Sequence, residues 1–226
     1  TGAPTTMTGR SFFVAFAFGQ LLVGPLSDRF GRKWLVVGGL ATFVFGCLVC
    51  ALAGDISVLI LGRITQALGA CAASVLSRAI ARDLFDGEAL ARALALTMIA
   101  MAASPGFSPL IGSALGGLFG WQTIFLGVAS FAAVLAGYYW KMLGETHPVE
   151  RRESLSLSAV GLAYVRLATN PQFILPALAV SLVIGALYTF FAAAPAVLIS
   201  VLGLTGLQLA LYFAGTVVIV FAAGFL

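Results

Sequence analysis

Charged residues are scarce in this chain of 226 residues: only 9% of them are Asp, Glu, Lys or Arg, and there is a single His. An ordinary soluble domain carries charge on about a quarter of its residues, so this chain could not cover a water-exposed surface. Only three cysteines are present, which excludes a disulfide scaffold. Hydrophobic residues, in contrast, make up 61% of the chain, and the mean hydropathy is +1.09. The composition therefore predicts a membrane protein.

Long stretches without any charge indicate how often the chain crosses the membrane. They cover 21 residues from Trp34 to Gly54, 48 from Ala93 to Trp140 and 60 from Leu167 to Leu226. A helix needs about 20 apolar residues to cross the hydrocarbon core, and these runs do not alternate as the strands of a barrel do. We therefore expect an all-α membrane protein, a polytopic helical bundle with about seven transmembrane helices. The crossings are expected near residues 6–26, 34–54, 57–81, 93–118, 121–140, 172–198 and 206–226.

Lys and Arg lie almost entirely on one side of this layout. Ten of them face one side, only Arg10 faces the other, and Arg63 falls inside a crossing. Cytoplasmic loops carry the excess of positive charge, which places the first side in the cytoplasm. The N-terminus of the chain is therefore expected outside.

Residues 141–170 form the only long polar stretch, and it is too short to bury a core. We expect a cytoplasmic linker there, with an interfacial helix from Leu157 to Leu167. This divides the chain into a first helical half (1–140), the linker (141–170) and the start of a second half (171–226). The chain opens on Thr1 instead of Met and ends within an apolar run, so we expect an internal fragment of a longer chain.

A short polar motif follows the first crossing, on the expected cytoplasmic side. It reads Gly24-Pro25-Leu26-Ser27-Asp28-Arg29-Phe30-Gly31-Arg32-Lys33. Anchoring of helices by cations explains the three basic residues but not the carboxylate and the two glycines. A turn this short needs Gly31, and Asp28 at the helix junction can pair with a cation or cap a helix N-terminus.

This motif resembles the cytoplasmic Gly-x-Leu-x-Asp-Arg-x-Gly-Arg-Lys motif of the major facilitator superfamily, which joins transmembrane helices two and three. Four further stretches are similar to the same family, and together they most resemble its bicyclomycin-resistance type of drug:proton antiporter. They are residues 61–70 (LGRITQALGA), 78–85 (RAIARDLF), 108–112 (SPLIG) and 120–125 (GWQTIF). The resemblance implies that the chain covers helices two to eight of twelve, in a multi-pass protein of the bacterial cytoplasmic (inner) membrane.

Arg63 is the most informative single residue, because a cation inside a crossing is costly and usually faces a partner or a water-filled cavity. No Asp or Glu lies deep in any expected crossing. We expect its partner to come from helices outside this sequence, from substrate, or from backbone carbonyls and Gln66, one turn away. The resemblance implies a proton-carrying acid on the family's first helix, outside this sequence.

Two interpretations stay open for Arg63 and for Gln66. Arg63 either takes part in transport or fixes the register of two helices, and Gln66 either lines a cavity or bonds a neighbouring helix. Our candidates for the substrate and proton-coupling cavity are Arg63, Gln66, Gln20 and Tyr188.

Seven residues on the cytoplasmic side are expected to form a conformational latch that favours the outward-facing state. They are Gly24, Asp28, Arg29, Gly31, Arg32, Lys33 and Asp83. Exposed salt bridges contribute only about 0 to 1 kcal/mol, but a two-state bundle can be shifted by that much. Solvated anchoring charges are the alternative, for Asp83 in particular.

The crossing at 93–118 carries prolines and a ladder of glycines, which bend a helix and allow close packing. The resemblance implies the antiporter motif, whose bend is thought to seal one side against ion leak, although Ser108 and Ser113 stand where its glycines are usual. Tight packing is the alternative. The residues expected to form the bend are Pro105, Pro109, Gly112 and Gly116.

Few polar groups lie in the crossings, so a cavity for a sugar would lack hydrogen-bond partners, and lipophilic drug-like compounds are favoured. We expect a secondary active transporter that exports such compounds in exchange for protons, by rocking of two bundles around a midplane site. Its expected partners are the lipid bilayer, the substrate and the proton. We expect no enzyme, no nucleic acid, no metal, no cofactor beyond the proton gradient, and a monomer when full length. The alternatives are a proton-coupled importer of a small metabolite and a non-transporting scaffold or receptor.

Overall fold

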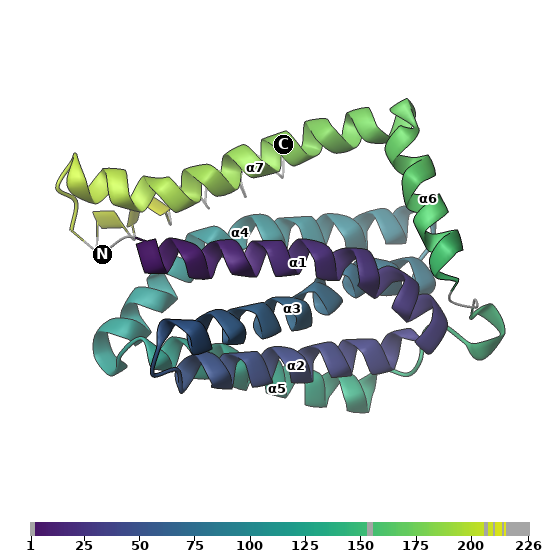
Figure 1. Cartoon of the computed structure of the whole chain (residues 1–226), viewed down its shortest axis with the longest axis horizontal. Helices are drawn as coiled ribbons and strands as arrows, with labels where there is room; N and C mark the ends of the chain where they lie inside the picture. Colours follow the sequence, from purple (N-terminus) through teal and green to yellow (C-terminus); the bar gives the residue numbers. More distant parts are fainter. Residues whose placement is uncertain (1–2, 153–155, 206–207, 210, 214, 216–226) are drawn as a thin grey trace. The chain divides into compact units, whose positions relative to one another are not determined.

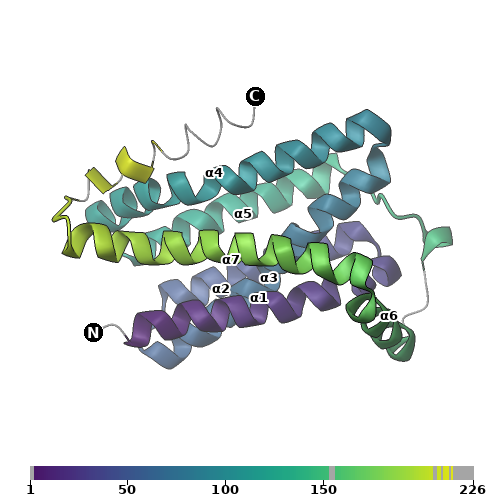
Figure 2. The same cartoon turned by 90° about the horizontal axis from the view of Figure 1, so that it is seen from above.

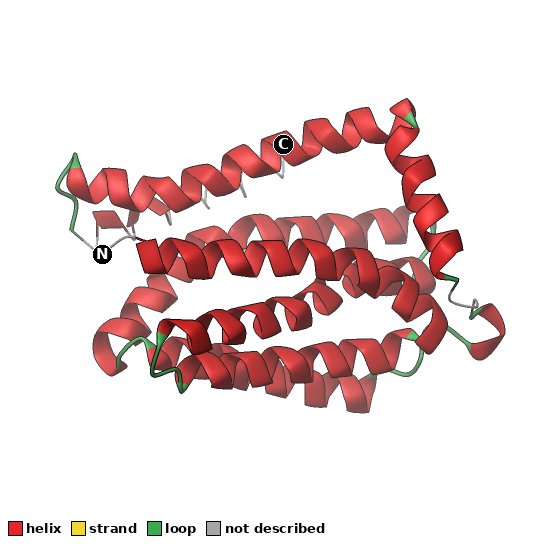
Figure 3. Cartoon of the chain, viewed as in Figure 1, coloured by secondary structure: helices red, strands yellow, loops and turns green. Residues whose placement is uncertain are grey.

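The computed structural model describes residues 3–152, 156–205, 208–209, 211–213 and 215, and this part of the chain is helical, without a strand (Figures 1 and 3). The fold class is therefore the expected all-α one. The long helices are α1 (Ala3–Phe30), α2 (Arg32–Ala51), α3 (Ile56–Leu84), α4 (Gly87–Phe119), α5 (Gln122–Met142), α6 (Leu157–Thr169) and α7 (Pro171–Ser200). A short 3-10 turn, Val149–Arg151, precedes α6.

Five stretches of the described helices are long and apolar enough to cross a membrane. They are Met7–Phe30, Arg32–Ala51, Ile56–Leu84, Gln122–Met142 and Pro171–Phe190. Each overlaps a predicted crossing, which confirms a polytopic arrangement. The crossing predicted at 93–118 falls within α4, a single helix of 33 residues. Most of the one predicted at 206–226 lies outside the described residues.

The chain separates into two compact units. The first comprises Thr1–Thr97 and Ala114–Leu155, and the second comprises Met98–Ser113 and Ser156–Leu226. The division into halves and a linker at residues 140 and 170 stays a prediction.

In the first unit, α3 packs against both α1 and α2, and α2 packs in turn against α5 (Figure 1). The buried side chains that hold these helices together are mostly aliphatic, with one aromatic ring. They are Val23, Val36, Leu40, Cys71, Ala72, Leu76, Ala132 and Tyr139. Because α3 contacts two neighbours, its buried polar residue, Gln66, lies where helices pack together.

Glycines bring α2 and α3 into backbone contact. A Cβ atom on Gly46 would overlap the backbone of Gln66, at 2.7 Å from its Cα, and one on Gly69 would lie 2.6 Å from the carbonyl oxygen of Gly39. Small residues permit this approach, as they do in many membrane helix pairs. The contact fixes Gln66 of α3 directly against α2.

The second unit contains α6 and α7, which meet at an angle (Figure 2). The hydroxyl of Ser156 accepts a hydrogen bond from the amide of Ala159 (3.3 Å), which starts α6 close to the predicted interfacial helix. The Oδ1 atom of Asn170 accepts one from the amide of Gln172 (3.0 Å), with Pro171 at the first helical position of α7. Both starts follow ordinary N-cap chemistry.

Candidate functional site

Arg32 joins three helices at the turn between α1 and α2. Its side chain is largely buried, with Nη1 at 2.6 Å from Asp28 Oδ1 and Nε at 3.1 Å from Asp83 Oδ2. Nη1 also donates to the buried hydroxyl of Ser27, which itself donates to the carbonyl of Gly24 (2.7 Å). Since Asp28 lies on α1 and Asp83 near the end of α3, one guanidinium holds the ends of α1, α2 and α3 together.

The carboxylate of Glu145 occupies the start of α2. It accepts hydrogen bonds from the backbone N–H groups of Arg32 (2.8 Å), Lys33 (3.3 Å) and His147 (3.0 Å). Arg152 lies 3.7 Å from the same carboxylate. Burial raises the pKa of Glu145, but these three donors and the charge of Arg152 outweigh burial, so its pKa lies below the usual value. Glu145 is therefore a charged cap on a helix N-terminus.

Gly31 is required at this turn for two reasons. Its φ angle is +90°, a conformation that residues with a Cβ rarely adopt. A Cβ atom there would also overlap the carboxyl group of Glu145 and lie 2.7 Å from Nη2 of Arg152. Gly24, the other glycine of the motif, has open space where a Cβ would stand. Packing therefore explains the glycine at position 31 and not the one at position 24.

The two remaining cations of the motif lie against aromatic rings. The guanidinium of Arg29 is 5.2 Å from the ring centre of Phe30, and Nζ of Lys33 is 4.9 Å from that of Trp140. Trp140 in turn meets Trp34 edge to face at 5.1 Å. The structure thus brings Asp28, Gly31, Arg32 and Asp83 together, and it places Arg29 and Lys33 on aromatic neighbours. The role of these residues as a latch stays a prediction.

Sequence reasoning missed Ser27, Glu145 and Thr146 at this site. The hydroxyl of Thr146 donates to Asp83 Oδ2 (3.2 Å), so it belongs to the same cluster. The available signal was position alone: Glu145 and Thr146 follow the crossing predicted at 121–140, on the same side of the membrane as the motif. Nothing local pairs a carboxylate with a helix start that lies 113 residues away.

A second polar cluster lies within the candidate membrane spans and centres on Arg63 of α3. Its Nη1 atom donates to Oε1 of Gln66 (2.6 Å), and its guanidinium lies 4.4 Å from the ring centre of Phe12 on α1. Gln66 is only 4% exposed, and its Nε2 atom donates to the thiol sulfur of Cys47 on α2 (3.0 Å). Of the partners expected for Arg63, Gln66 is the one present here, and Gln66 itself bonds a neighbouring helix.

The other two cavity candidates, Gln20 and Tyr188, lie on α1 and α7. Gln20 is half-buried on α1, and Tyr188 lies exposed on α7, in the second unit. Of the neighbours of Arg63 and Gln66, Phe12 could be expected from the sequence either to line a cavity or to face lipid or core, whereas Cys47 was expected only to pack. A thiol on an apolar helix resembles an ordinary packing residue, so the sequence context of Cys47 carries no signal.

The residues expected to bend α4 are described only in part. Pro105 and Pro109 lie in α4, but their side chains are outside the described part of the chain. A Cβ atom on Gly116 would lie 3.2 Å from Cδ1 of Ile124 on α5, whereas Gly112 has open space beside it. The close contact at Gly116 fits tight packing of α4 and α5, and the bend stays a prediction.

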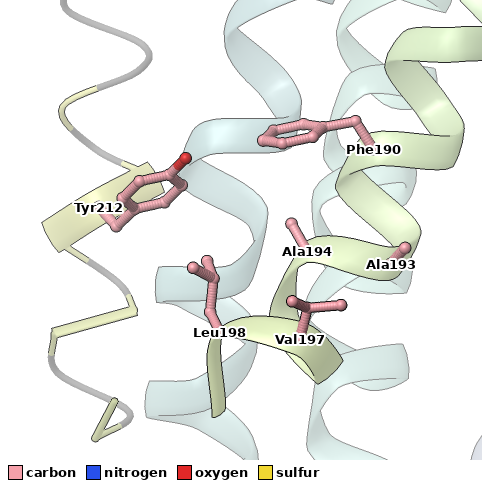
Figure 4. A pocket seen from close by; sticks show the side chains of 6 residues that line it. All are labelled: Phe190, Ala193, Ala194, Val197, Leu198 and Tyr212. Atoms are coloured by element: carbon pink, nitrogen blue, oxygen red, sulfur yellow. The ribbon is translucent and has the colours of Figure 1, made fainter. Parts of the chain in front are cut away.

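The second unit contains a pocket of about 240 Å³ (Figure 4). Its lining residues are Phe190, Ala193, Ala194, Val197, Leu198 and Tyr212. In Figure 4 the rings of Phe190 and Tyr212 lie in the upper part of the view, and the side chains of the alanines, Val197 and Leu198 lie below them. With one phenol hydroxyl as the polar group among these side chains, the pocket suits an apolar occupant.

Comparison with known proteins decides the family. The family model described as Major Facilitator Superfamily matches residues 2–226. The chain belongs to the major facilitator superfamily. This membership confirms the family predicted from the motif, and with the apolar helices it establishes a multi-pass membrane protein. A crystal structure of the peptide transporter POT with sulfate has the same fold, with a TM-score of 0.56 over 92% of this chain and 40% of that one, at 18% identity.

Several curated relatives are similar to this chain in sequence. The multidrug transporter MdfA of Yersinia pestis is 31% identical over 197 residues, which cover 87% of this chain and 47% of MdfA. A bicyclomycin resistance protein homolog of Haemophilus influenzae is 28% identical over 216 residues, covering 96% and 54%. The uncharacterized transporter YdgK of Bacillus subtilis is 32% identical over 194 residues, covering 85% and 48%. The chain thus spans about half the length of the curated relatives it matches.

Proposed function

We propose that this major facilitator protein is a secondary active transporter that exports lipophilic, drug-like compounds in exchange for protons across the bacterial cytoplasmic membrane. Family membership supports transport, and the names of two relatives, a multidrug transporter and a bicyclomycin resistance protein homolog, support drug export. The observation that carries the proposal is the Arg63 cluster: an intramembrane cation held by a neutral amide and an aromatic ring.

In the proposed mechanism, Arg63 provides the fixed charge of the exchange site. Gln66 accepts one of its N–H groups, and the thiol of Cys47 fixes the amide of Gln66 in turn. A guanidinium has five N–H donors, so others remain to bind a proton-carrying carboxylate while that group is charged. When the carboxylate takes up a proton, its attraction to Arg63 weakens. The charge of this one carboxylate would then determine whether the site binds a proton or a drug.

The Arg32 cluster is the proposed latch. It ties the cytoplasmic ends of α1, α2 and α3 through Asp28 and Asp83, so the three helices move as one body. The latch favours the outward-facing state by a free energy of the order that a two-state bundle responds to, about 1 kcal/mol. Turnover requires both states, so breaking the latch changes the balance between them.

The proposed substrate class follows from the chemistry of the spans. The described lining of the second unit's pocket is apolar apart from a tyrosine hydroxyl. In the first unit, the Arg63 cluster offers one cation and one aromatic face. Apolar surface with few oriented polar groups binds lipophilic compounds better than sugars. The proposal includes a monomer in the lipid bilayer, powered by the proton gradient without another cofactor.

Everted membrane vesicles with the complete transporter test the proposal. Their interior is acidified by respiration and followed with a pH-sensitive dye while lipophilic cations and neutral drugs are added. We expect drugs to dissipate the gradient, and Arg63→Ala to abolish the effect. Arg92→Ala is the matched control, since Arg92 is an exposed cation that pairs with Glu88 one turn away. A gradient that responds only to polar metabolites would contradict drug export.

A further inference from the structure

The start of the linker is bound to the first unit by two successive side chains. Glu145 accepts the N–H groups of Arg32 and Lys33 at the start of α2 (2.8 and 3.3 Å). Thr146 donates to Asp83 at the end of α3 (3.2 Å). The residues directly after α5 thus contact the ends of two other helices.

The start of α2 needs the partner that Glu145 supplies. The first N–H groups of a helix have no acceptor within the helix, and a negative charge beside them is stabilised by the helix dipole. Asp28, the nearest acid of the motif, already pairs with the side chain of Arg32. Gly31 has no side chain that could cap α2, so the carboxylate comes from the linker.

Gly31 and Glu145 are complementary in shape. The space in which a side chain on Gly31 would begin is filled by the Glu145 carboxyl group, with Nη2 of Arg152 at 2.7 Å from that point. Arg152 also faces the Glu145 carboxylate at 3.7 Å. The glycine of the motif therefore leaves room for a carboxylate and a cation of the linker, in addition to allowing the turn.

We propose that Glu145 is a positioning residue of the latch. By holding the first turn of α2, it keeps the guanidinium of Arg32 between Asp28 and Asp83, and it makes residues 144–152 move with the helices of the first unit, to which they belong. Only the part of the linker after residue 152 then connects this anchored segment to the second unit. The anchoring is independent of the transport activity, whereas its effect on turnover rests on the proposed function.

Hydrogen exchange of the complete transporter in lipid nanodiscs tests the anchoring. The variant is Glu145→Ala, and the matched control is Glu150→Ala, which removes an exposed carboxylate of the same linker. We expect amides in peptides covering 31–36 and 144–152 to exchange about tenfold faster in Glu145→Ala, the factor that corresponds to about 1.4 kcal/mol, and to be unchanged in the control. Unchanged exchange in Glu145→Ala, or equal acceleration in both variants, would overturn the proposal.

A double-mutant cycle tests the fit between Gly31 and Glu145. Gly31→Ala is expected to lower the melting temperature of the purified transporter, because of both the positive φ angle and the overlap with Glu145. In the Glu145→Ala background only the φ strain and the contact with Arg152 remain, so the same change should cost less. Equal losses in the two backgrounds would contradict the complementarity.

Transport assays on the same variants separate the two levels of the inference. We expect Glu145→Ala to lower the turnover of drug efflux about threefold without a change in KM, and Glu145→Gln, which keeps an acceptor oxygen, to recover part of it. Turnover at the parent's rate in Glu145→Ala would overturn the positioning role. If the parent itself exchanges no drug for protons, the proposed function fails while the exchange experiment still decides the anchoring.

Discussion

Two arginines on neighbouring helices are held in opposite ways. Arg32 lies among carboxylates, with Asp28 and Asp83 on its side chain. Arg63 has a neutral amide at 2.6 Å and an aromatic ring at 4.4 Å. A cation between two acids is satisfied and serves to hold structure, whereas a cation with neutral neighbours keeps capacity for a further anion. The first arrangement suits a latch and the second an exchange site.

The two acids of the Arg32 cluster should differ in their contribution to stability. The side chain of Asp83 is 17% exposed and that of Asp28 is 48% exposed, so water screens the second pair more. We expect Asp83→Asn to destabilise the protein by about 1 to 3 kcal/mol and Asp28→Asn by less than 1 kcal/mol. Thermal unfolding of both purified variants checks the order. The reverse order would show that burial does not govern these pairs.

Gln66 should matter for transport through Arg63. Gln66→Leu removes the acceptor at 2.6 Å from Arg63, and we expect drug efflux to fall by about tenfold or more. Cys47→Ser keeps an acceptor for Gln66 and should stay near the parent's activity, whereas Cys47→Ala should be intermediate. Cys71→Ala is the control, because Cys71 is equally buried but bonds the carbonyl of Leu68. Full efflux by Gln66→Leu would exclude the positioning of Arg63 by this amide.

The lowered pKa of Glu145, which lies outside the candidate membrane spans, should make the stability of the protein depend on pH. Three backbone donors and the charge of Arg152 lower its pKa below the ordinary 4.5. A carboxyl group with a depressed pKa in the folded state stabilises the protein at neutral pH, and this stabilisation is lost as the pH falls below 4.5 through the folded pKa. The melting temperature of the parent should therefore exceed that of Glu145→Gln at about pH 7, and the difference should shrink at about pH 3. A difference that is constant over this range would contradict a charged cap.

At the scale of the helices, the contact between α2 and α3 supports both clusters. Arg32 begins α2 and pairs with Asp83 at the end of α3, while Cys47 lies near the other end of α2 and bonds Gln66 in the first half of α3. The glycines between them allow backbone contact. A change in this contact would therefore displace the latch and the exchange site together.

Glycine substitutions test the role of this contact. Gly46→Ala places a methyl group against the backbone of Gln66, which cannot give way as a flexible side chain can. We expect a loss of about 1 to 3 kcal/mol in stability, measured by thermal unfolding. Gly38→Ala on the same helix adds its methyl group in open space, so it should be neutral or slightly stabilising. Similar behaviour of the two variants would exclude close packing as the reason for glycine at position 46.

The helices were largely predictable, because apolar runs and breaks at glycine or charge determine where spans begin and end. α3 and α5 lie within a few residues of the predicted crossings. The contacts of the sites were less accessible. The pairing of Arg32 with Asp28 follows from their spacing of one helical turn, and that of Arg63 with Gln66 follows from theirs. The cap at Glu145 and the contact of Arg63 with the ring of Phe12 depend on how separate helices pack, which no local pattern encodes.

At the scale of the whole molecule, charge is scarce, and the Lys and Arg residues are almost all accounted for by the two clusters and by the preference of cations for the cytoplasmic side. The chain spans about half the length of its curated relatives, and its first unit carries both the proposed latch and the proposed exchange site. We therefore propose that this unit couples drug and proton, and that export of substrate requires the complete transporter.

Coupled flux in liposomes tests this account most directly. The purified complete transporter is reconstituted into liposomes without a pH gradient, a gradient of a lipophilic drug is imposed, and drug and proton movements are recorded together. The account predicts that drug moving down its gradient drives protons in the opposite direction, and that Arg63→Ala abolishes the proton movement. Drug movement without protons, or the same proton movement in Arg63→Ala, would contradict it.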